Sequence, residues 1–367
     1  MFLVAGGATS SPRLRSCRGA LGTVSLSGGG RVDARVVAIV VNKDGAAYLR
    51  GCLSSLLAQT YTDLQVVLVD NASRDDSVEL VRREFPVVHI IQSTSNLGFC
   101  AANNLAVRST SSELVATLNN DTWVEPGWLE SLVRTLESNA TLGSVASLMV
   151  FADRLDVVNS AGICIDRAGI AWDRLGGAPV PQALDEGNRE VFGACAGAAL
   201  YRRTVLDQVG GFDDSFFAYL DDVDLAWRLR LAGFGCRLVT DTRVRHVHSA
   251  TGVEGSPLKS YLRGRNKLRT IIKDYPAPQI LFNLPLILIY DLAAVTYALL
   301  WLRDLPALRG RLSVLRDLPV LLGQRRQIQS QRRAPFAALS AQMSSLETPW
   351  RVYGRFAHVV RRAQART

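Results

Sequence analysis

The chain of 367 residues lacks the residue patterns that mark several large protein classes. Its six cysteines include no CxxC pair, which predicts reduced thiols and argues against a zinc site or a disulfide framework. Neither GxGxxG nor GxxxxGK followed by Ser or Thr occurs, so a Rossmann dinucleotide site and a P-loop are without support. The apolar run 1–5 is short and has no basic leader, so we expect no secretory signal peptide and a cytoplasmic catalytic part.

Acidic residues become scarce toward the end of the chain. From residue 259 onward, 19 Lys and Arg residues stand against 5 Asp and Glu residues, of totals of 42 and 33. This distribution predicts a mildly acidic globular domain followed by a basic attachment. The arginines of 303–333 alternate with Leu and Val and not with stacking aromatic residues, which favours an anionic membrane surface over nucleic acid as the partner.

Composition divides the chain into four segments. Residues 1–34 are rich in Gly, Ser and Arg without periodicity, which predicts a disordered leader. Residues 35–275 have the pattern of a folded domain. We expect membrane-associated helices at 276–333 and a basic C-terminal tail at 334–367.

Short β-branched runs alternate with stretches of helical spacing in the folded domain. We expect strands at 35–42, 64–70, 87–91 and 114–118, and helices at 46–59, from an N-cap at Ser73, at 101–107 and at 222–233. This alternation predicts an α/β fold with a mostly parallel central sheet and helices on both faces. Such sheets bind ligands at the carboxyl ends of their strands, so the polar residues after each strand are candidates for the site.

Polar residues follow three of these strands. Asp70 ends the second strand, where a carboxylate accepts hydrogen bonds from a base or a ribose, or starts an Asx-type turn; both interpretations are equally supported. Asn96 and Gly98 follow the third, where free backbone amides suit an anion and Asn also suits a helix cap. Asp121 follows the fourth, as an oxygen ligand for a divalent cation or as part of a surface turn.

Two adjacent acids, Asp221 and Asp222, lie between an aromatic segment and a predicted helix. They either favour the helix start through its dipole or include a general base whose pKa is raised by an apolar setting. His246 follows a short strand and is a candidate metal ligand, although a histidine satisfied by hydrogen bonds is the commoner case.

The order and spacing of these clusters resemble those of the family 2 glycosyltransferases of the GT-A fold, within them the rhamnosyltransferase-like branch. The resemblance covers about two thirds of the chain. The motifs that carry it are, in order, VVNKDG, VDNASRDDS, NLGFCAANN, LNNDTWVEPGWLE, GACAGAALYRR, VGGFDDSFFAYLDDVDLAWRLRLAGF, RHVHSAT and RGRN.

The resemblance implies roles for these residues in a nucleotide-sugar-binding fold. Asp222 would be the base that deprotonates the acceptor hydroxyl, with Asp221 and Trp227 on the acceptor side. Asp121 and His246 would hold a divalent metal, Mg²⁺ or Mn²⁺. The nucleoside diphosphate sugar, a dTDP- or UDP-sugar, would be bound by Asn42, Asp70, Ser73, Asn96, Gly98, Asn104, Asn120 and Arg265.

The function implied is inverting transfer of a single sugar, rhamnose or another deoxyhexose, to a lipid-linked or cell-envelope glycan. A sugar-nucleotide-binding protein without transfer activity and another hexosyl- or N-acetylhexosaminyltransferase of the same fold are the alternatives. A nucleotidyltransferase would carry a Gly-rich, lysine-containing loop near its first strand, and a processive synthase would carry QxxRW. Neither pattern occurs.

The apolar run 280–301 is long enough to cross a bilayer. Asn283, Pro285 and Asp291 interrupt it, and an ionisable group near the middle of a span is costly. We therefore favour helices that lie in the interface, or a monotopic hairpin, over a true span. The expected location is the cytoplasmic face of the plasma membrane.

Overall fold

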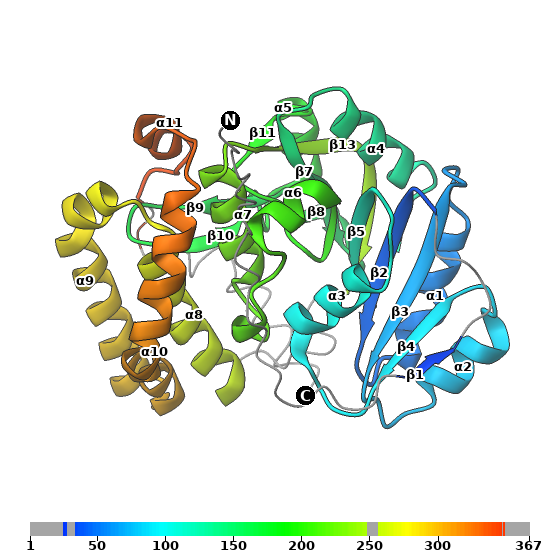
Figure 1. Cartoon of the computed structure of the whole chain (residues 1–367), viewed down its shortest axis with the longest axis horizontal. Helices are drawn as coiled ribbons and strands as arrows, with labels where there is room; N and C mark the ends of the chain where they lie inside the picture. The colour runs from blue at the N-terminus through cyan, green and yellow to red at the C-terminus, as the bar shows by residue number, and fades with distance from the viewer. Residues whose placement is uncertain (1–24, 28–33, 248–255, 347, 349–367) are drawn as a thin grey trace, which may run out of the picture.

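The computed structural model describes residues 25–27, 34–247, 256–346 and 348, and a large mixed sheet forms its centre (Figure 1). A separate hairpin consists of β9 (Ile163–Ile165) and β10 (Ala171–Asp173). The order across the sheet is β1 (Ser25–Ser27), β4 (His89–Ser93), β3 (Leu64–Asn71), β2 (Val36–Asn42), β5 (Leu114–Asn119), β12 (Ala198–Arg202), β7 (Leu142–Phe151), β13 (Gly235–His246) and β11 (Glu190–Val191). Two further strands pair outside this order: β6 (Thr122–Val124) pairs with β13, and β8 (Arg154–Ser160) pairs with β7.

Strands β4, β3, β2 and β5 run parallel, so their carboxyl ends share one edge of the sheet. The strands predicted at 35–42, 64–70 and 114–118 are confirmed. The strand predicted at 87–91 begins two residues later, because 86–88 lie in a turn. Strand β12 is antiparallel to both of its neighbours, and β7 and β13 are parallel to each other.

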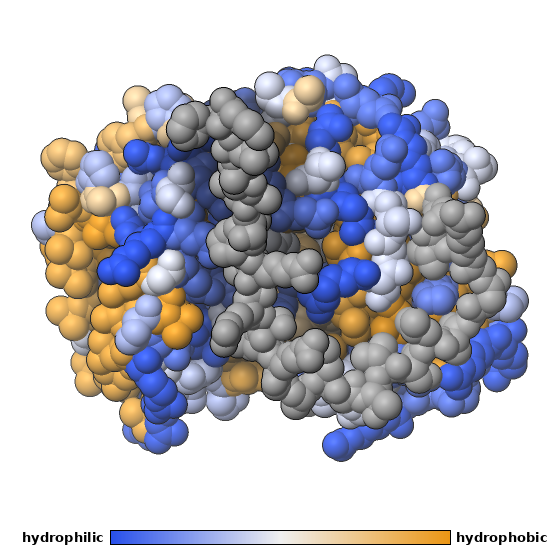
Figure 2. All heavy atoms as spheres, viewed as in Figure 1, coloured by the Kyte–Doolittle hydropathy of each residue, from blue (hydrophilic) through white to orange (hydrophobic). Residues whose placement is uncertain are grey.

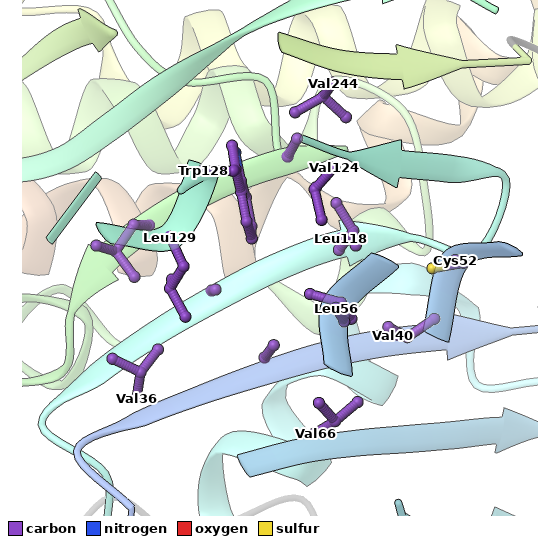
Figure 3. Packing of buried hydrophobic residues seen from close by; sticks show 14 of the residues in the cluster. Val36, Val40, Cys52, Leu56, Val66, Leu118, Val124, Trp128, Leu129 and Val244 are labelled. Atoms are coloured by element: carbon purple, nitrogen blue, oxygen red, sulfur yellow. The ribbon is translucent and has the colours of Figure 1, made fainter. Parts of the chain in front are cut away.

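Helices cover both faces of the sheet because the β-branched strands are apolar on both sides. Val36 and Val40 of β2 belong to one cluster of buried residues, whereas Val37 and Ile39 belong to the other. The first cluster, shown in Figure 3, is covered by α1 (Ala46–Leu57), α2 (Ser77–Glu84) and α4 (Trp128–Glu137). The second is covered by α3 (Gly98–Arg108), α5 (Val180–Glu186), α6 (Arg203–Val209) and α7 (Asp221–Leu231).

In the described residues, four further helices follow the sheet, and Figure 1 shows them along one side of the domain. They are α8 (Pro257–Asp274), α9 (Ala277–Leu300), α10 (Leu305–Ser330) and α11 (Phe336–Ala341). A third apolar cluster joins them to the domain, since it holds Trp227 and Tyr275 together with Ile287 of α9 and Leu339 of α11.

Helix α9 is, in the described part of the chain, the one helix long and apolar enough to cross a membrane, with a mean hydropathy of 1.7. Its Asp291 is paired with Lys267 of α8 (Nζ to Oδ1, 3.3 Å) and with Arg311 of α10 (Nε to Oδ2, 2.9 Å). The charge inside the apolar run is thus neutralised within the protein, and this side of α9 faces the other two helices.

Three local predictions differ from the structure. The helix expected from an N-cap at Ser73 begins at Ser77 after Asp76, because the Ser73 hydroxyl is engaged elsewhere. The helix expected at 101–107 begins earlier, at Gly98. Ser25–Ser27 form an edge strand on β4, although 1–34 was expected to be disordered; the rest of that segment, and most of the tail after 346, lie outside the described residues. The five cysteines in the described part are free thiols, as predicted.

Candidate active site

A network of side chains lies where β2, β3 and β5 end. Asn42 donates to the Ser73 hydroxyl (3.1 Å) and accepts from the Asn120 amide (2.7 Å). Register places Asn42 directly opposite Asp70 on the parallel neighbour. The strand-end residues Asn42, Asp70, Ser73 and Asn120 are therefore brought together, although they come from three separate segments of the chain.

Asp70 is the polar anchor of this network. It is only 3% exposed, and its Oδ2 accepts from the backbone N–H of Ser73 at 3.3 Å. Its Oδ1 is buried and has no hydrogen-bond partner in the structure. A buried carboxylate oxygen without a donor is costly, so this atom is suited to accept from an N–H or O–H group of a ligand.

Asp121 and His246 face each other at the far side of the same edge. Asp121 Oδ1 lies 3.3 Å from His246 Nε2, and both side chains are largely buried. His246 Nδ1 lies 2.8 Å from the Asn159 side-chain oxygen, which accepts a hydrogen bond from the tautomer that carries its proton on Nδ1. The amide of Asn119 points at Nε2 from 3.4 Å, consistent with an unprotonated Nε2.

A cation between Asp121 and His246 would be bound by both groups, because Nε2 offers a lone pair and the carboxylate offers an oxygen. One carboxylate and one imidazole, with remaining positions left to phosphate oxygens and water, are an adequate ligand set for Mg²⁺ or Mn²⁺. Neither at this site nor in the rest of the described residues do three or more His, Cys, Asp or Glu side chains surround a common metal position. The residues therefore fit a metal that is shared with a phosphate ligand.

The acidic pair lies at the start of α7. Asp222 accepts from the backbone N–H groups of Val223 (2.9 Å) and Ala196 (3.4 Å). Burial, and then the negative charge of Asp173 on β10, raise the pKa of Asp222 to about 6. Burial and the charge of Asp222 also raise the pKa of Asp221. With a pKa of about 6, Asp222 is ionised at neutral pH.

The segment before the acidic pair has an unusual backbone. Phe217, Tyr219 and Leu220 have φ values of 67°, 65° and 60°, a conformation that side chains with a Cβ rarely adopt. We call 216–220 the acid loop, because it leads directly into Asp221 and Asp222. Strain of this kind persists only when surrounding contacts impose it.

Three residues expected at the donor are placed against or beside the acid loop. Gly98 has φ 79°, and an added Cβ would lie 2.6 Å from the carbonyl oxygen of Phe217. The Asn104 side-chain amide donates to the backbone carbonyl of Phe212 and accepts from the backbone N–H of the same residue, shortly before the loop. Arg265 donates to the carbonyl of Phe216 (3.0 Å). These contacts give Gly98, Asn104 and Arg265 a supporting role for the loop.

Two other predicted residues also have structural partners. Asn96 accepts from the Asn71 amide (3.0 Å) and from the N–H of Gly98 (3.0 Å), which fixes the start of α3. Trp227, expected on the acceptor side, is fully buried between Phe192 (5.0 Å between ring centroids) and Tyr275 (4.6 Å). It is a core residue, and no acceptor can reach it in this conformation.

The site also contains residues that the sequence alone did not single out. Asp173 and Asn159 come from the irregular stretch 143–200, where short strands gave no strand-end pattern. Asn266 stands in RGRN, and its amide bonds to the acid loop. The sequence shows Asn266 as a polar residue within a basic helix, but no pattern in the sequence connects it with a loop about 50 residues earlier.

Residues 36–210 match the family model for glycosyl transferase family 2. The O-antigen biosynthesis protein RfbC of Myxococcus xanthus is 31% identical over 227 residues, which is 59% of this chain and 18% of that protein. The N-acetylglucosaminyl-diphospho-decaprenol L-rhamnosyltransferase of Mycobacterium tuberculosis is 25% identical over 249 residues, 62% of this chain and 80% of that protein. The chain spans less than two thirds of several curated relatives, among them 54% of an uncharacterized glycosyltransferase of Nostoc.

Two solved structures share the fold. The mannosyltransferase PcManGT of Pyrobaculum calidifontis, solved with GDP-Man and Mn²⁺, has a TM-score of 0.50 at 19% identity and covers 91% of this chain and 86% of its own. GalNAc-T7, solved with UDP, GalNAc and Mn²⁺, has a TM-score of 0.53 at 15% identity and covers 65% and 48%. The sequence match and the common architecture agree: the chain carries a family 2 glycosyltransferase domain, matched over residues 36–210, it has the GT-A fold, and a rhamnosyltransferase is among its relatives.

Proposed function

We propose that the protein is an inverting glycosyltransferase that moves one sugar from a nucleoside diphosphate donor to a lipid-linked or cell-envelope glycan. The observation that carries the proposal is the pair of sites at one sheet edge: Asp70, a buried carboxylate with one oxygen that has no hydrogen-bond partner, and Asp222, a carboxylate of raised pKa. The relatives named for O-antigen biosynthesis and for rhamnosyl transfer support a deoxyhexose such as rhamnose as the sugar.

In this proposal the strand-end residues hold the donor. Asp70 accepts from the nucleoside, while Asn42 and Ser73 keep its carboxylate and the adjoining turn in place. Asp121 and His246 would hold a divalent cation, which neutralises charge on the leaving diphosphate. The hydrogen bond from His246 Nδ1 to Asn159 keeps Nε2 directed at Asp121.

Asp222 acts on the acceptor. As the acceptor oxygen bonds to the anomeric carbon and the bond from that carbon to the diphosphate oxygen breaks, the hydroxyl proton passes to the Asp222 carboxylate. Attack from the face opposite the leaving group inverts the anomeric centre through an oxocarbenium-like transition state, by analogy with glycoside hydrolysis. A base with a pKa of about 6 is ionised at neutral pH and still accepts a proton readily.

The test is a screen of nucleoside diphosphate sugars with the purified chain, read as nucleoside diphosphate release with Mg²⁺, Mn²⁺ or chelator. We expect release that depends on metal and acceptor, and a product of inverted anomeric configuration by NMR. The variant Asp121→Ala should lose both turnover and Mn²⁺ binding, measured by titration calorimetry with UDP present. A retained configuration, or full activity of Asp121→Ala in chelator, contradicts the proposal.

We also propose that α9 and α10 rest on the cytoplasmic face of the plasma membrane. Figure 2 shows hydrophobic residues gathered over these helices, and their outer side chains are largely exposed. Arginines of α10 lie among them, which suits anionic headgroups. The outer apolar residues include Leu281, Phe282, Leu288, Ile289, Leu292, Leu300, Trp301, Leu312, Leu315 and Val320.

A further inference from the structure

We infer that Asn266 is a positioning residue for Asp222, acting through the acid loop. Its amide nitrogen lies within hydrogen-bond distance of three carbonyl oxygens of that loop: Phe216 (3.1 Å), Ala218 (2.9 Å) and Tyr219 (2.8 Å). Its amide oxygen accepts from Arg265 Nε at 3.0 Å, so both ends of the side chain are engaged. Asn266 is fully buried and stands in the middle of α8.

The acid loop needs hydrogen bonds from neighbouring elements because its own backbone disfavours the observed conformation. Three residues without glycine's freedom lie in the left-handed region, and Leu220, the N-cap of α7, has no side-chain cap hydrogen bond. Without outside partners, the loop carbonyls would reorient and the φ values would relax. Asp222 is two residues beyond Leu220, so any such relaxation moves its carboxylate.

A second element holds the loop from the opposite side. The N–H groups of Phe99 (2.6 Å) and Cys100 (3.3 Å), at the start of α3, donate to the carbonyl of Phe217. Phe217 therefore bonds to α3, whereas its neighbours on both sides bond to Asn266 of α8. The acid loop is fixed between the two helices. On the α8 side the Asn266 amide bonds to three of its carbonyls, and Arg265 also donates to that of Phe216.

Arg269 extends this contact to the outer helices. It donates to the Ser215 carbonyl (3.1 Å) just before the loop and pairs with Asp317 of α10. Asn266 lies three residues earlier, on the same side of α8. The position of Asp222 is thus set by α8, and α8 is held in turn by α10.

The first test measures the loop itself. Hydrogen exchange followed by mass spectrometry should be at least about tenfold faster for peptides that cover 216–222 in Asn266→Ala, with little change in β2 and β3. The matched control is Gln329→Ala, which also removes an amide that bonds to carbonyls of α8, at Asp274 (2.8 Å), but contacts nothing in the acid loop. Exchange in 216–222 that is unchanged in Asn266→Ala overturns the inference, whether or not the chain is a transferase.

The second test measures the consequence and rests on the proposed function. With dTDP-rhamnose or the donor selected by the screen, Asn266→Ala should lower the single-turnover rate constant by ~10²-fold, as expected when a reacting group is misplaced by about an ångström. The reaction amplitude and the stoichiometry of UDP or dTDP binding should stay at parent values. A purely structural defect would lower amplitude and stoichiometry together and leave the rate constant of the folded fraction unchanged.

Two further variants separate the possible failures. Asn266→Ser keeps one donor for the loop carbonyls and should fall between the parent and Asn266→Ala in both measurements; it also serves if the alanine variant does not fold. Asp222→Asn serves as the reference. If Asp222→Asn turns over at the parent rate, Asp222 is not the base. The hydrogen-exchange result alone then decides whether Asn266 holds the acid loop. If Asp222→Asn is slow while Asn266→Ala is as fast as the parent, only the positioning inference is overturned.

Discussion

At the scale of single residues, Asp222 separates a transferase from a binding protein. Asp222→Asn keeps the size of the side chain, and its oxygen can still accept from Val223, while an amide nitrogen replaces the oxygen that accepts from Ala196; the amide cannot take a proton. We expect donor affinity to survive and the transfer rate to fall by ~10²–10⁴. Isothermal titration with the donor, paired with single-turnover rates, provides the measurement.

The neighbouring acid is the control for this variant. Burial and the charge of Asp222 raise the pKa of Asp221, which favours its protonated form, and the proposal places the acceptor base at Asp222. Asp221→Asn should therefore change the rate by less than about tenfold. If both variants transfer sugar as fast as the parent, the chain is better described as a sugar-nucleotide-binding protein or as a transferase with another base.

Asp173 is expected to set the pH dependence. Burial and the charge of Asp173 raise the pKa of Asp222 to about 6, and only the ionised carboxylate accepts a proton. The single-turnover rate should therefore be low in acid, rise through about pH 6 and level off above it. Asp173→Asn removes a negative neighbour, so the pKa of Asp222 falls and the rise should move to lower pH.

The control for Asp173→Asn is Asp156→Asn, an exposed acid that does not act on Asp222. It makes the same change in net charge and should leave the pH profile in place. A shift of the Asp173→Asn profile to higher pH would show that Asp173 does not act on the base through its charge.

At the scale of elements, the crossing of α8 and α10 depends on glycine. A Cβ added to Gly310 would lie 2.1 Å from the carbonyl oxygen of Tyr261, and one added to Gly264 would lie 2.7 Å from that of Ala307. Gly310→Ala should force the helices apart and lower the free energy of unfolding by ~1–3 kcal/mol. Urea denaturation of the full chain is the measurement.

Gly323 offers a matched control in the same helix. A Cβ there meets nothing within 4 Å, so Gly323→Ala should stabilise α10 by ~0.5–1 kcal/mol. The reason is that the unfolded chain has less backbone entropy with alanine than with glycine at this position. If the free energy of unfolding falls in Gly310→Ala and rises in Gly323→Ala, close packing is the reason that glycine is needed at 310. Equal shifts would mean that helix propensity alone explains both.

The elements also show how far sequence reasoning reaches. The β-branched runs predicted the parallel strands, and parallel strands bring their ends together, so the position of Asn42, Asp70 and Asp121 at one edge of the sheet was predicted without a structure. Trp227 was misplaced because α7 is buried on nearly every side, its charges paired internally, as in Arg228 with Asp224. A helix without an exposed face gives no pattern from which to decide where one side chain points.

Asp173 and Asn266 could not be found in this way, for a different reason. Asp173 lies on a strand of three residues, too short for a period to be recognised. Asn266 acts on carbonyl groups about 50 residues away, and backbone carbonyls carry no residue-specific signal. Contacts between side chain and distant backbone depend on tertiary packing alone.

At the scale of the whole molecule, the exposed apolar side of α9 is expected to bind lipid. Phe282 and Leu292 are 80% and 68% exposed, and burying each in the interface contributes ~1.5–3 kcal/mol. Replacing both by Glu should weaken binding to vesicles of phosphatidylglycerol and phosphatidylcholine by at least about 100-fold, measured by co-sedimentation. Raised salt should weaken binding of the parent as well, since the arginines of α10 contribute.

Val87→Glu is the control for the membrane experiment. Val87 is 71% exposed but lies in the turn before β4, far along the chain from α9. It should leave vesicle binding unchanged. If the α9 variant binds vesicles as tightly as the parent, the exposed apolar side has another partner.

The third apolar cluster has a practical consequence for protein production. Ile287 of α9 and Leu339 of α11 complete the packing around Trp227 and Tyr275, and the backbone of Arg333 bonds to Leu231 at 2.8 Å. A fragment cut at 275, where the composition changes, would uncover this cluster and leave Lys267 and Arg269 without Asp291 and Asp317. We expect such a fragment to aggregate on expression, whereas the full chain with Phe282 and Leu292 replaced by Glu should purify without detergent.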